Sequence, residues 1–123
     1  MIEQNILIFT EKEEEFANLL IAVGTKKNVA KVLVYLLNTN EATARAIERG
    51  TDLRQPEVSM ALKYMADHGW VMSTKIPSER NGRPNNKYSL AIPKKEIIAA
   101  IEEAKKTEVN DQLSLIRKIR NCI

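Results

Sequence analysis

Residues 79–88, ERNGRPNNKY, bring positive charge and hydrogen-bond donors together in a stretch without aliphatic side chains. Arg80 and Arg83 lie on either side of a glycine and next to a proline, a combination typical of a tight loop. Guanidinium groups donate in a rigid fork that matches phosphate oxygens. Six basic residues against one glutamate give residues 70–95 a net charge of +5, whereas the first 22 residues carry five glutamates and one lysine. The positive field is therefore expected around this loop.

A second group of polar side chains falls at helical spacing further upstream. In residues 55–68, apolar side chains recur at i, i+3, i+4 and i+7, which predicts a helix whose buried stripe is made of Val58, Ala61, Leu62 and Met65. Pro56 is tolerated because it falls in the first turn. The opposite side is polar but scarcely charged, and with the residue just before the helix it carries Arg54, Gln55, Ser59, Met60 and Lys63.

The elements that must position these two groups begin with helices. Four are expected before residue 70, over residues 10–23, about 26–37, 41–49 and 55–68. In the first, Thr10 and Glu13 form a capping box and Gly24 ends the helix. The third is expected to be capped from the polar turn at 38–40 and stopped by Gly50. The first two helices are expected to face inward with Phe16, Leu19, Leu20, Val23, Val29, Val32, Leu33, Leu36 and Leu37.

The sequence period changes at Trp70, which is expected to be a core residue. Alternation over residues 70–76 predicts a half-buried strand, and alternation over residues 86–92 predicts a second one, so the two form a hairpin. Pro93 breaks the second strand, and one or two helices follow to the C-terminus. The expected fold class is mainly α with a small β-hairpin, in a single domain of 123 residues.

This order of elements, carried by QPEVSMALKYMADHGWV and NGRPNNKYSL, resembles the winged helix-turn-helix transcription regulators, particularly the small archaeal and bacterial MarR-like and TrmB-like groups. The resemblance covers about residues 26–92 and implies a winged helix-turn-helix with extra N- and C-terminal helices. It implies that residues 55–68 are the recognition helix and that GRP is the wing tip. The seven residues between Gly50 and Val58 make the turn longer than the tight form of the motif.

The resemblance implies a sequence-specific duplex-DNA-binding transcriptional regulator. In the major groove, glutamine can pair with adenine, serine with several base edges and methionine with a thymine methyl group. A guanidinium held out on a Gly-Pro loop can enter a narrow minor groove, whose negative potential attracts it. The candidate DNA-binding residues are Arg54, Gln55, Ser59, Met60, Lys63, Arg80, Asn81, Arg83, Asn86 and Lys87. Glu57 would be repelled by phosphates, and its role stays open.

The two ends of the chain carry apolar stripes beyond what the winged domain needs. Residues 10–23 and residues 94–123 are therefore expected to be dimerisation elements, as the resemblance also implies. The candidate interface residues are Phe16, Leu20, Val109, Leu113 and Ile116. A two-fold homodimer would place two recognition helices about one DNA turn, roughly 34 Å, apart on a pseudo-palindromic site.

No pattern supports catalysis, a metal site or a membrane span. Cys122 is the only cysteine and His68 the only histidine, so neither an internal disulfide nor a zinc site is expected. Nucleophile triads, paired carboxylates in an apolar setting and phosphate-binding loops are absent from the sequence. The apolar run at residues 6–9 is too short for a signal peptide or a membrane span. We expect a cytoplasmic protein that is not an enzyme and needs no cofactor.

Two other functions remain compatible with the sequence. A winged-helix protein-interaction module in a larger assembly would turn the basic hairpin to an acidic partner and depend on Met60 and Tyr64. A ligand-responsive regulator would hold a small-molecule effector in a dimer cleft, but no convergent polar cluster supports an effector. Cys122 is expected to be an inert thiol, with a disulfide to a second copy as the alternative.

Overall fold

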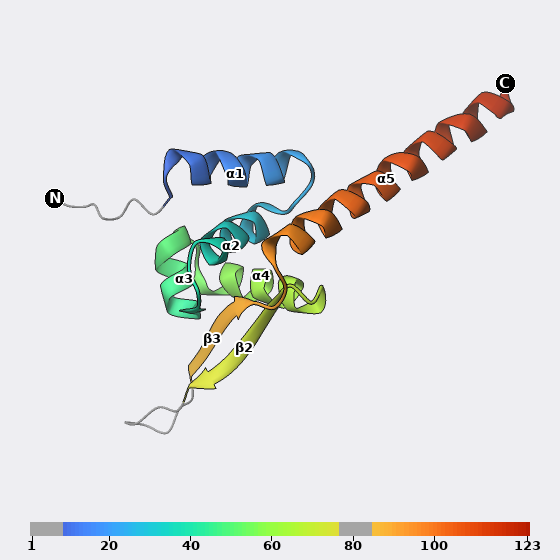
Figure 1. The fold of residues 1–123 in the computed structure, drawn as a ribbon. Helices are drawn as coiled ribbons and strands as arrows, with labels where there is room; N and C mark the ends of the chain where they lie inside the picture. Colours follow the sequence, from blue (N-terminus) through green and yellow to red (C-terminus); the bar gives the residue numbers. More distant parts are fainter. Residues whose placement is uncertain (1–8, 77–84) are drawn as a thin grey trace. The chain divides into compact units, whose positions relative to one another are not determined.

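A computed structural model of the protein describes residues 9–76 and 85–123. The chain forms two structural units, Met1–Ile92 and Pro93–Ile123. Within the described residues, the elements of the first unit follow the order α1 (Glu11–Ala22), α2 (Lys27–Leu37), β1 (Ala42–Thr43), α3 (Ala44–Thr51), α4 (Gln55–Asp67), β2 (Val71–Ile76) and β3 (Asn85–Leu90). Figure 1 shows the helices of this unit and its β2–β3 hairpin. The second unit is the helix α5 (Lys94–Cys122). The expected class, mainly α with a small β wing, is confirmed.

The start of α1 is set by the predicted capping box. Thr10 Oγ1 accepts a hydrogen bond from the Glu13 amide at 3.2 Å, and Glu13 Oε1 accepts one from the Thr10 amide at 2.8 Å. Three glutamates in the first turn also favour this end, because the helix dipole is positive there. Gly24 follows the helix with φ of +112°, a conformation that favours glycine.

The apolar stripe expected on α1 is only partly correct. Leu20 is buried together with Ala17, which the pattern did not single out. Phe16, Leu19 and Val23 instead lie on the outer side of the helix and are 36%, 59% and 44% exposed. The main packing partner of α1 is α2, so α1 buries only a narrow stripe and its remaining apolar side chains face outward.

The core of the first unit is built around α2. Six of its eleven residues are buried, and Val32, Leu33 and Val34 are completely inaccessible to solvent. In Figure 1, α2 lies between α1 and α4, and it contacts both of these helices as well as α3. Because α2 is covered on several sides, it keeps only a narrow polar side, which includes Lys27 and Lys31.

Both ends of α3 differ from the sequence prediction. Its N-cap is Thr43, whose Oγ1 accepts from the Ala46 amide at 3.2 Å, and the polar turn at 38–40 does not cap it. The helix does not stop at Gly50 but continues to Thr51, and Asp52 leaves it in the left-handed conformation at φ 59°. The turn before α4 therefore comprises only residues 52–54, so the prediction of a long turn was wrong.

Gly50 has a packing role within α3. A Cβ atom at this position would collide with the ring of Tyr35 on α2. Only glycine lets the two helices approach this closely without displacing the ring. The glycine that the sequence marked as a helix stop is therefore a contact point between α2 and α3.

The predicted buried stripe of α4 is confirmed, since Val58, Ala61, Leu62 and Met65 are all buried. Gly69 follows the helix with φ of +75°, as expected for a glycine that ends a helix. The amide of Trp70 then donates to the Met65 carbonyl at 2.8 Å, and Trp70 is buried, as expected.

The wing belongs to a sheet of three antiparallel strands in the order β1-β3-β2, not to a two-stranded hairpin alone. The central strand is β3, and Tyr88 on it is paired with Ala42 of β1 and with Ser73 of β2. The prediction that β2 is half-buried was wrong. Val71 is buried, but residues 72–75 are exposed.

The second unit resolves the choice between one and two C-terminal helices, since α5 is one helix of 29 residues that begins after Pro93. Its C-terminal half exposes apolar side chains, namely Val109, Leu113, Leu115, Ile116 and Ile119. Among the described residues, no helix combines the length and apolar character needed to cross a membrane.

Candidate nucleic-acid interface

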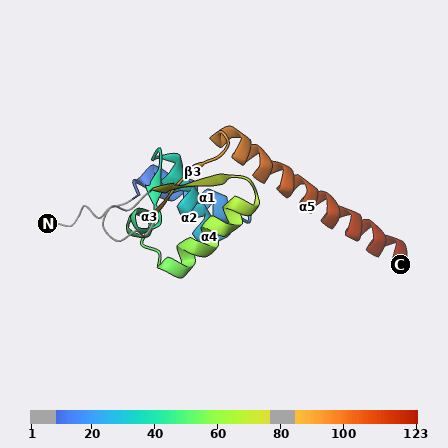
Figure 2. The same cartoon turned by 90° about the horizontal axis from the view of Figure 1, so that it is seen from below.

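The structure brings the candidate residues of the predicted recognition helix together on one exposed face of α4. In Figure 2, α4 runs along one edge of the first unit. Met60 is 74% exposed, which is a high solvent exposure for a large apolar side chain in a unit with a packed core. The other members of this face, Gln55, Ser59 and Lys63, are also exposed, as is Arg54 just before the helix.

Glu57 has a structural role that the sequence left open. Its Oε1 accepts a hydrogen bond from the Arg54 amide at 2.9 Å, across the start of α4. A carboxylate in the first turn also interacts favourably with the positive end of the helix dipole. The negative charge is therefore used to hold the beginning of α4 in place, next to the exposed face.

A groove of about 390 Å³ runs between α4 and the sheet. One wall is the flank of α4, where Gln55, Ser59 and Lys63 follow each other at four-residue intervals. Tyr88 on β3 forms the other wall, and the remaining lining residues are Ala44, Leu62 and Ala66. The sequence pattern had grouped Tyr88 with the apolar side of its strand, so its place beside α4 was missed.

The wing residues fall into two sets. Arg80, Asn81 and Arg83 lie outside the described residues. On β3, Asn86 is exposed, and the Lys87 ammonium group lies 2.9 Å from Glu41 Oε1. The cation predicted to meet phosphates thus has a carboxylate beside it in the protein.

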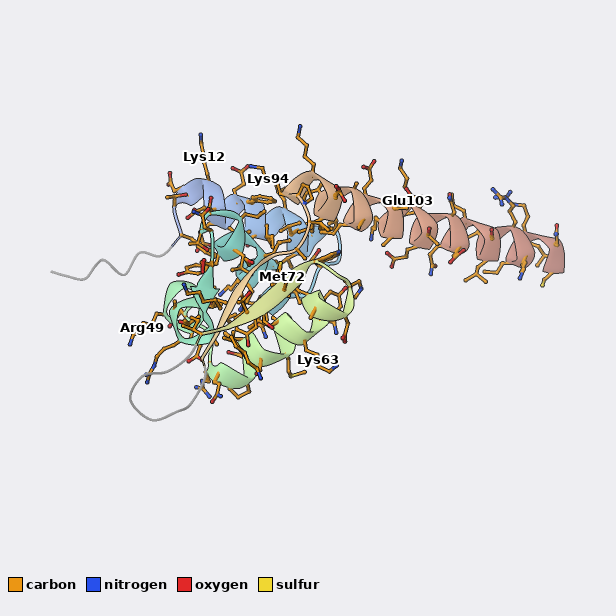
Figure 3. The ribbon with its side chains drawn as sticks, turned by 60° about the horizontal axis from the view of Figure 1, so that its bottom comes forward. Lys12, Arg49, Lys63, Met72, Lys94 and Glu103 are labelled. Atoms are coloured by element: carbon orange, nitrogen blue, oxygen red, sulfur yellow. The ribbon has the colours of Figure 1, made fainter. Side chains whose placement is uncertain are left out.

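Two exposed arginines on α3 were not among the predicted site residues. Arg45 and Arg49 are separated by one helical turn and are both exposed. Figure 3 shows Arg49 and Lys63 projecting away from α3 and α4. The spacing i, i+4 places the two arginines on one side of the helix. This spacing is present in the sequence, but α3 is too short for it to form a clear helical pattern.

On the flank of α4 away from the groove, aromatic side chains secure the end of the helix. The Tyr64 and His68 rings stack with centroids 4.2 Å apart, and His68 Nδ1 lies 2.8 Å from the Tyr64 carbonyl oxygen. Trp70 lies edge-on to Tyr64 at 6.0 Å. These contacts agree with the structural roles expected for His68 and Trp70.

The candidate dimerisation residues are exposed with one exception. Phe16, Val109, Leu113 and Ile116 are 36%, 44%, 46% and 48% exposed. Leu20 is only 6% exposed, so its side chain belongs to the core of the protomer and does not form a surface for a second copy. On α1, Leu19 and Val23 occupy the outer positions instead.

Comparison with known proteins agrees with this architecture. The family model described as "Sugar-specific transcriptional regulator TrmB" matches residues 19–94, more than half of the chain. No curated protein sequence gives a significant match. The matched family consists of transcriptional regulators, which confirms that the chain is not an enzyme.

Solved structures of winged-helix regulators share the fold. The archaeal chromatin protein TrmBL2 superposes with a TM-score of 0.66 at 15% identity, over 89% of this chain, which spans only 39% of that protein's length. A protein described as a possible transcriptional regulator from Methanosarcina mazei Go1 gives a TM-score of 0.63 at 17% identity, covering 94% of this chain and 97% of the other. A MarR family transcription regulator gives 0.51 at 16% identity, covering 90% and 77%. The family model covers more than half of the chain, and the helices and strands between Lys27 and Leu90 form a winged helix-turn-helix. The protein therefore belongs to the TrmB family of transcriptional regulators.

Proposed function

We propose that the protein regulates transcription by binding a preferred sequence in duplex DNA. Membership of a family of transcriptional regulators implies DNA binding. The observation that carries the proposal is the exposed face of α4, which presents Gln55, Ser59, Met60 and Lys63 opposite a fully packed stripe. A helix that is anchored on one side and polar but nearly uncharged on the other is suited to inspect base edges in the major groove.

The division of labour follows from the chemistry of the two surfaces. Gln55 and Ser59 offer hydrogen bonds to base edges, and Met60 offers an apolar contact to a thymine methyl group. Arg54, Arg45 and Arg49 are exposed cations near the same helix-turn-helix, and they would contact phosphates. Such contacts position the protein on the duplex without selecting a sequence.

The wing supplies a second, sequence-independent contact. Arg83 would enter the adjacent minor groove, while the neighbouring polar residues Arg80, Asn81, Asn86 and Lys87 would line the phosphates. Support comes from the concentration of positive charge in this part of the sequence and from the exposure of Asn86. For Lys87, binding requires exchange of Glu41 for a phosphate oxygen.

We also propose that the chain acts as one winged-helix domain and binds as a homodimer through α1 and α5. On α5, the exposed residues Val109, Leu113, Ile116 and Ile119 follow one another at intervals of four, three and three, which keeps them on one side of the helix. The outer side of α1 adds Phe16, Leu19 and Val23. Exposed apolar stripes of this length are stabilised when a second copy covers them, and a two-fold dimer would match a pseudo-palindromic site.

Selection of bound fragments from random duplex DNA tests the proposal directly, because it reports binding, preference and two-fold symmetry together. The affinity for the selected site should fall steeply with salt, with a log–log slope of about −0.9 for each neutralised phosphate. Gln55→Ala or Ser59→Ala should weaken mainly the selected site, whereas Arg83→Ala should weaken all duplexes alike. Recovery of no enriched sequence, or equal losses on every duplex from the α4 variants, would contradict sequence-specific reading by α4.

A further inference from the structure

We propose that the groove between α4 and β3 seats one sugar–phosphate strand of the DNA and that the Tyr88 hydroxyl donates a hydrogen bond to a phosphate in it. The inference deepens the proposed function and rests on it. It assigns a DNA-binding role to Tyr88, a residue that was not among the candidates from the sequence and that the family match does not single out.

The position of the groove is the first argument. If α4 enters the major groove and the β2–β3 wing meets the adjacent minor groove, the strand that separates these two grooves must pass between α4 and the wing. The groove lies between the flank of α4 and β3, and it is lined from both elements. The volume of the groove is about 390 Å³.

The chemistry of the lining is the second argument. Lys63 and Tyr88 carry side-chain donors on the two walls of the groove, and none of the described residues that line it is a carboxylate. A phosphodiester is an anion that only accepts hydrogen bonds, so one cation and one hydroxyl donor facing each other match it, while Gln55 and Ser59 on the same flank of α4 remain available to base edges. The apolar lining residues Ala44, Leu62 and Ala66 offer a surface to the carbon atoms of deoxyribose.

The backbone around Tyr88 is the third argument. Tyr88 lies on the central strand and is paired with Ala42 on one side and Ser73 on the other. Its position relative to the sheet is thus fixed before DNA arrives, which lowers the ordering cost of a contact. Lys63 on the opposite wall lies 3.2 Å from Asp67, but both side chains are more than 60% exposed, and such a pair yields readily to a phosphate.

The test compares Tyr88→Phe with wild type on the selected duplex and on a scrambled one. Removal of a neutral donor to a charged acceptor should weaken both duplexes by about tenfold and leave the salt slope unchanged. Lys63→Gln should also weaken both, but it should reduce the slope by about 0.9 because one phosphate loses its cation. Tyr64→Phe is the matched control, since Tyr64 lies on the flank of α4 away from the groove, and it should bind as wild type does.

Duplexes with single methylphosphonate substitutions then locate the contact. In each half-site, one substitution should weaken wild type and have no further effect on Tyr88→Phe, because both changes remove the same hydrogen bond. Equal thermal unfolding of the two proteins establishes that the variant is folded. Additive losses at every phosphate, or an unchanged affinity of Tyr88→Phe, would overturn the role of Tyr88 while DNA binding stands. A folded wild-type protein without affinity for any duplex would overturn the proposed function and this inference together.

Discussion

Lys87 on β3 and Glu41, the residue before β1, form an ion pair with 2.9 Å between Nζ and Oε1. Both side chains are almost half exposed, at 44% and 49%, so water screens the pair and its contribution to stability is small, about 0–1 kcal/mol. The two residues are far apart in the sequence and are brought together because β1, which follows Glu41, pairs with β3. If Lys87 contacts a DNA phosphate, as proposed, that phosphate competes with Glu41 for the ammonium group.

Glu41→Gln should therefore strengthen DNA binding. The change removes a carboxylate beside a cation that is proposed to meet phosphates, and an affinity gain of about two- to fivefold is expected at low salt, shrinking as salt screens the charges. Binding isotherms at two salt concentrations measure it. Glu15→Gln on α1 changes the net charge equally and controls for the overall field. An equal gain from both variants would argue against a local competition at Lys87.

Truncation of two methionines on α4 should change the free energy of unfolding by very different amounts. Met65 is fully buried, and Met65→Ala should lower the free energy of unfolding by about 2–5 kcal/mol because it leaves a cavity. Met60 is 74% exposed, so Met60→Ala should change stability by less than about 0.5 kcal/mol. Urea denaturation measures both, and DNA affinity should fall for Met60→Ala on the selected site. A large loss of stability from Met60→Ala would mean that its side chain packs against the protein.

The hydrogen bond from the Arg54 amide to Glu57 should stabilise the start of α4. Glu57→Ala removes the acceptor and should cost about 0.5–2 kcal/mol of unfolding free energy, as the loss of a helix cap does. Glu57→Gln keeps a carbonyl oxygen at the same distance along the side chain and should cost less. Urea denaturation of both variants separates the cases. Equal losses would assign the effect to the charge and the helix dipole instead of the hydrogen bond.

The apolar side of α5 should be required for dimerisation. Ile116→Asp places a charge in the middle of the exposed stripe and should shift the protein to monomers in sedimentation equilibrium at tens of micromolar, with weaker binding to a two-fold site. Ser114→Asp adds the same charge on the polar side of the same helix and should leave the dimer intact. A monomeric wild-type protein at this concentration would remove the dimer from the proposal.

Local features of this protein were determined by the sequence itself. The Thr10–Glu13 capping box, the buried stripe of α4 and the glycine after each of α1 and α4 all form between residues within about two helical turns. The interactions that specify them are present in the spacing of residue types, and so α4 and its exposed face could be predicted.

Other features were decided only when distant segments came together. The two-residue strand β1 exists because it pairs with β3, and two residues carry no alternation that a pattern could reveal. In the sequence, Gly50 indicates the end of a helix, and only the structure shows that it lies inside α3 against the ring of Tyr35. The groove lined by Gln55, Ser59, Lys63 and Tyr88, and the ion pair between Glu41 and Lys87, likewise depend on tertiary contacts. Periodicity indicates which side of an element is apolar, but only packing decides what covers that side and which polar groups then face one another.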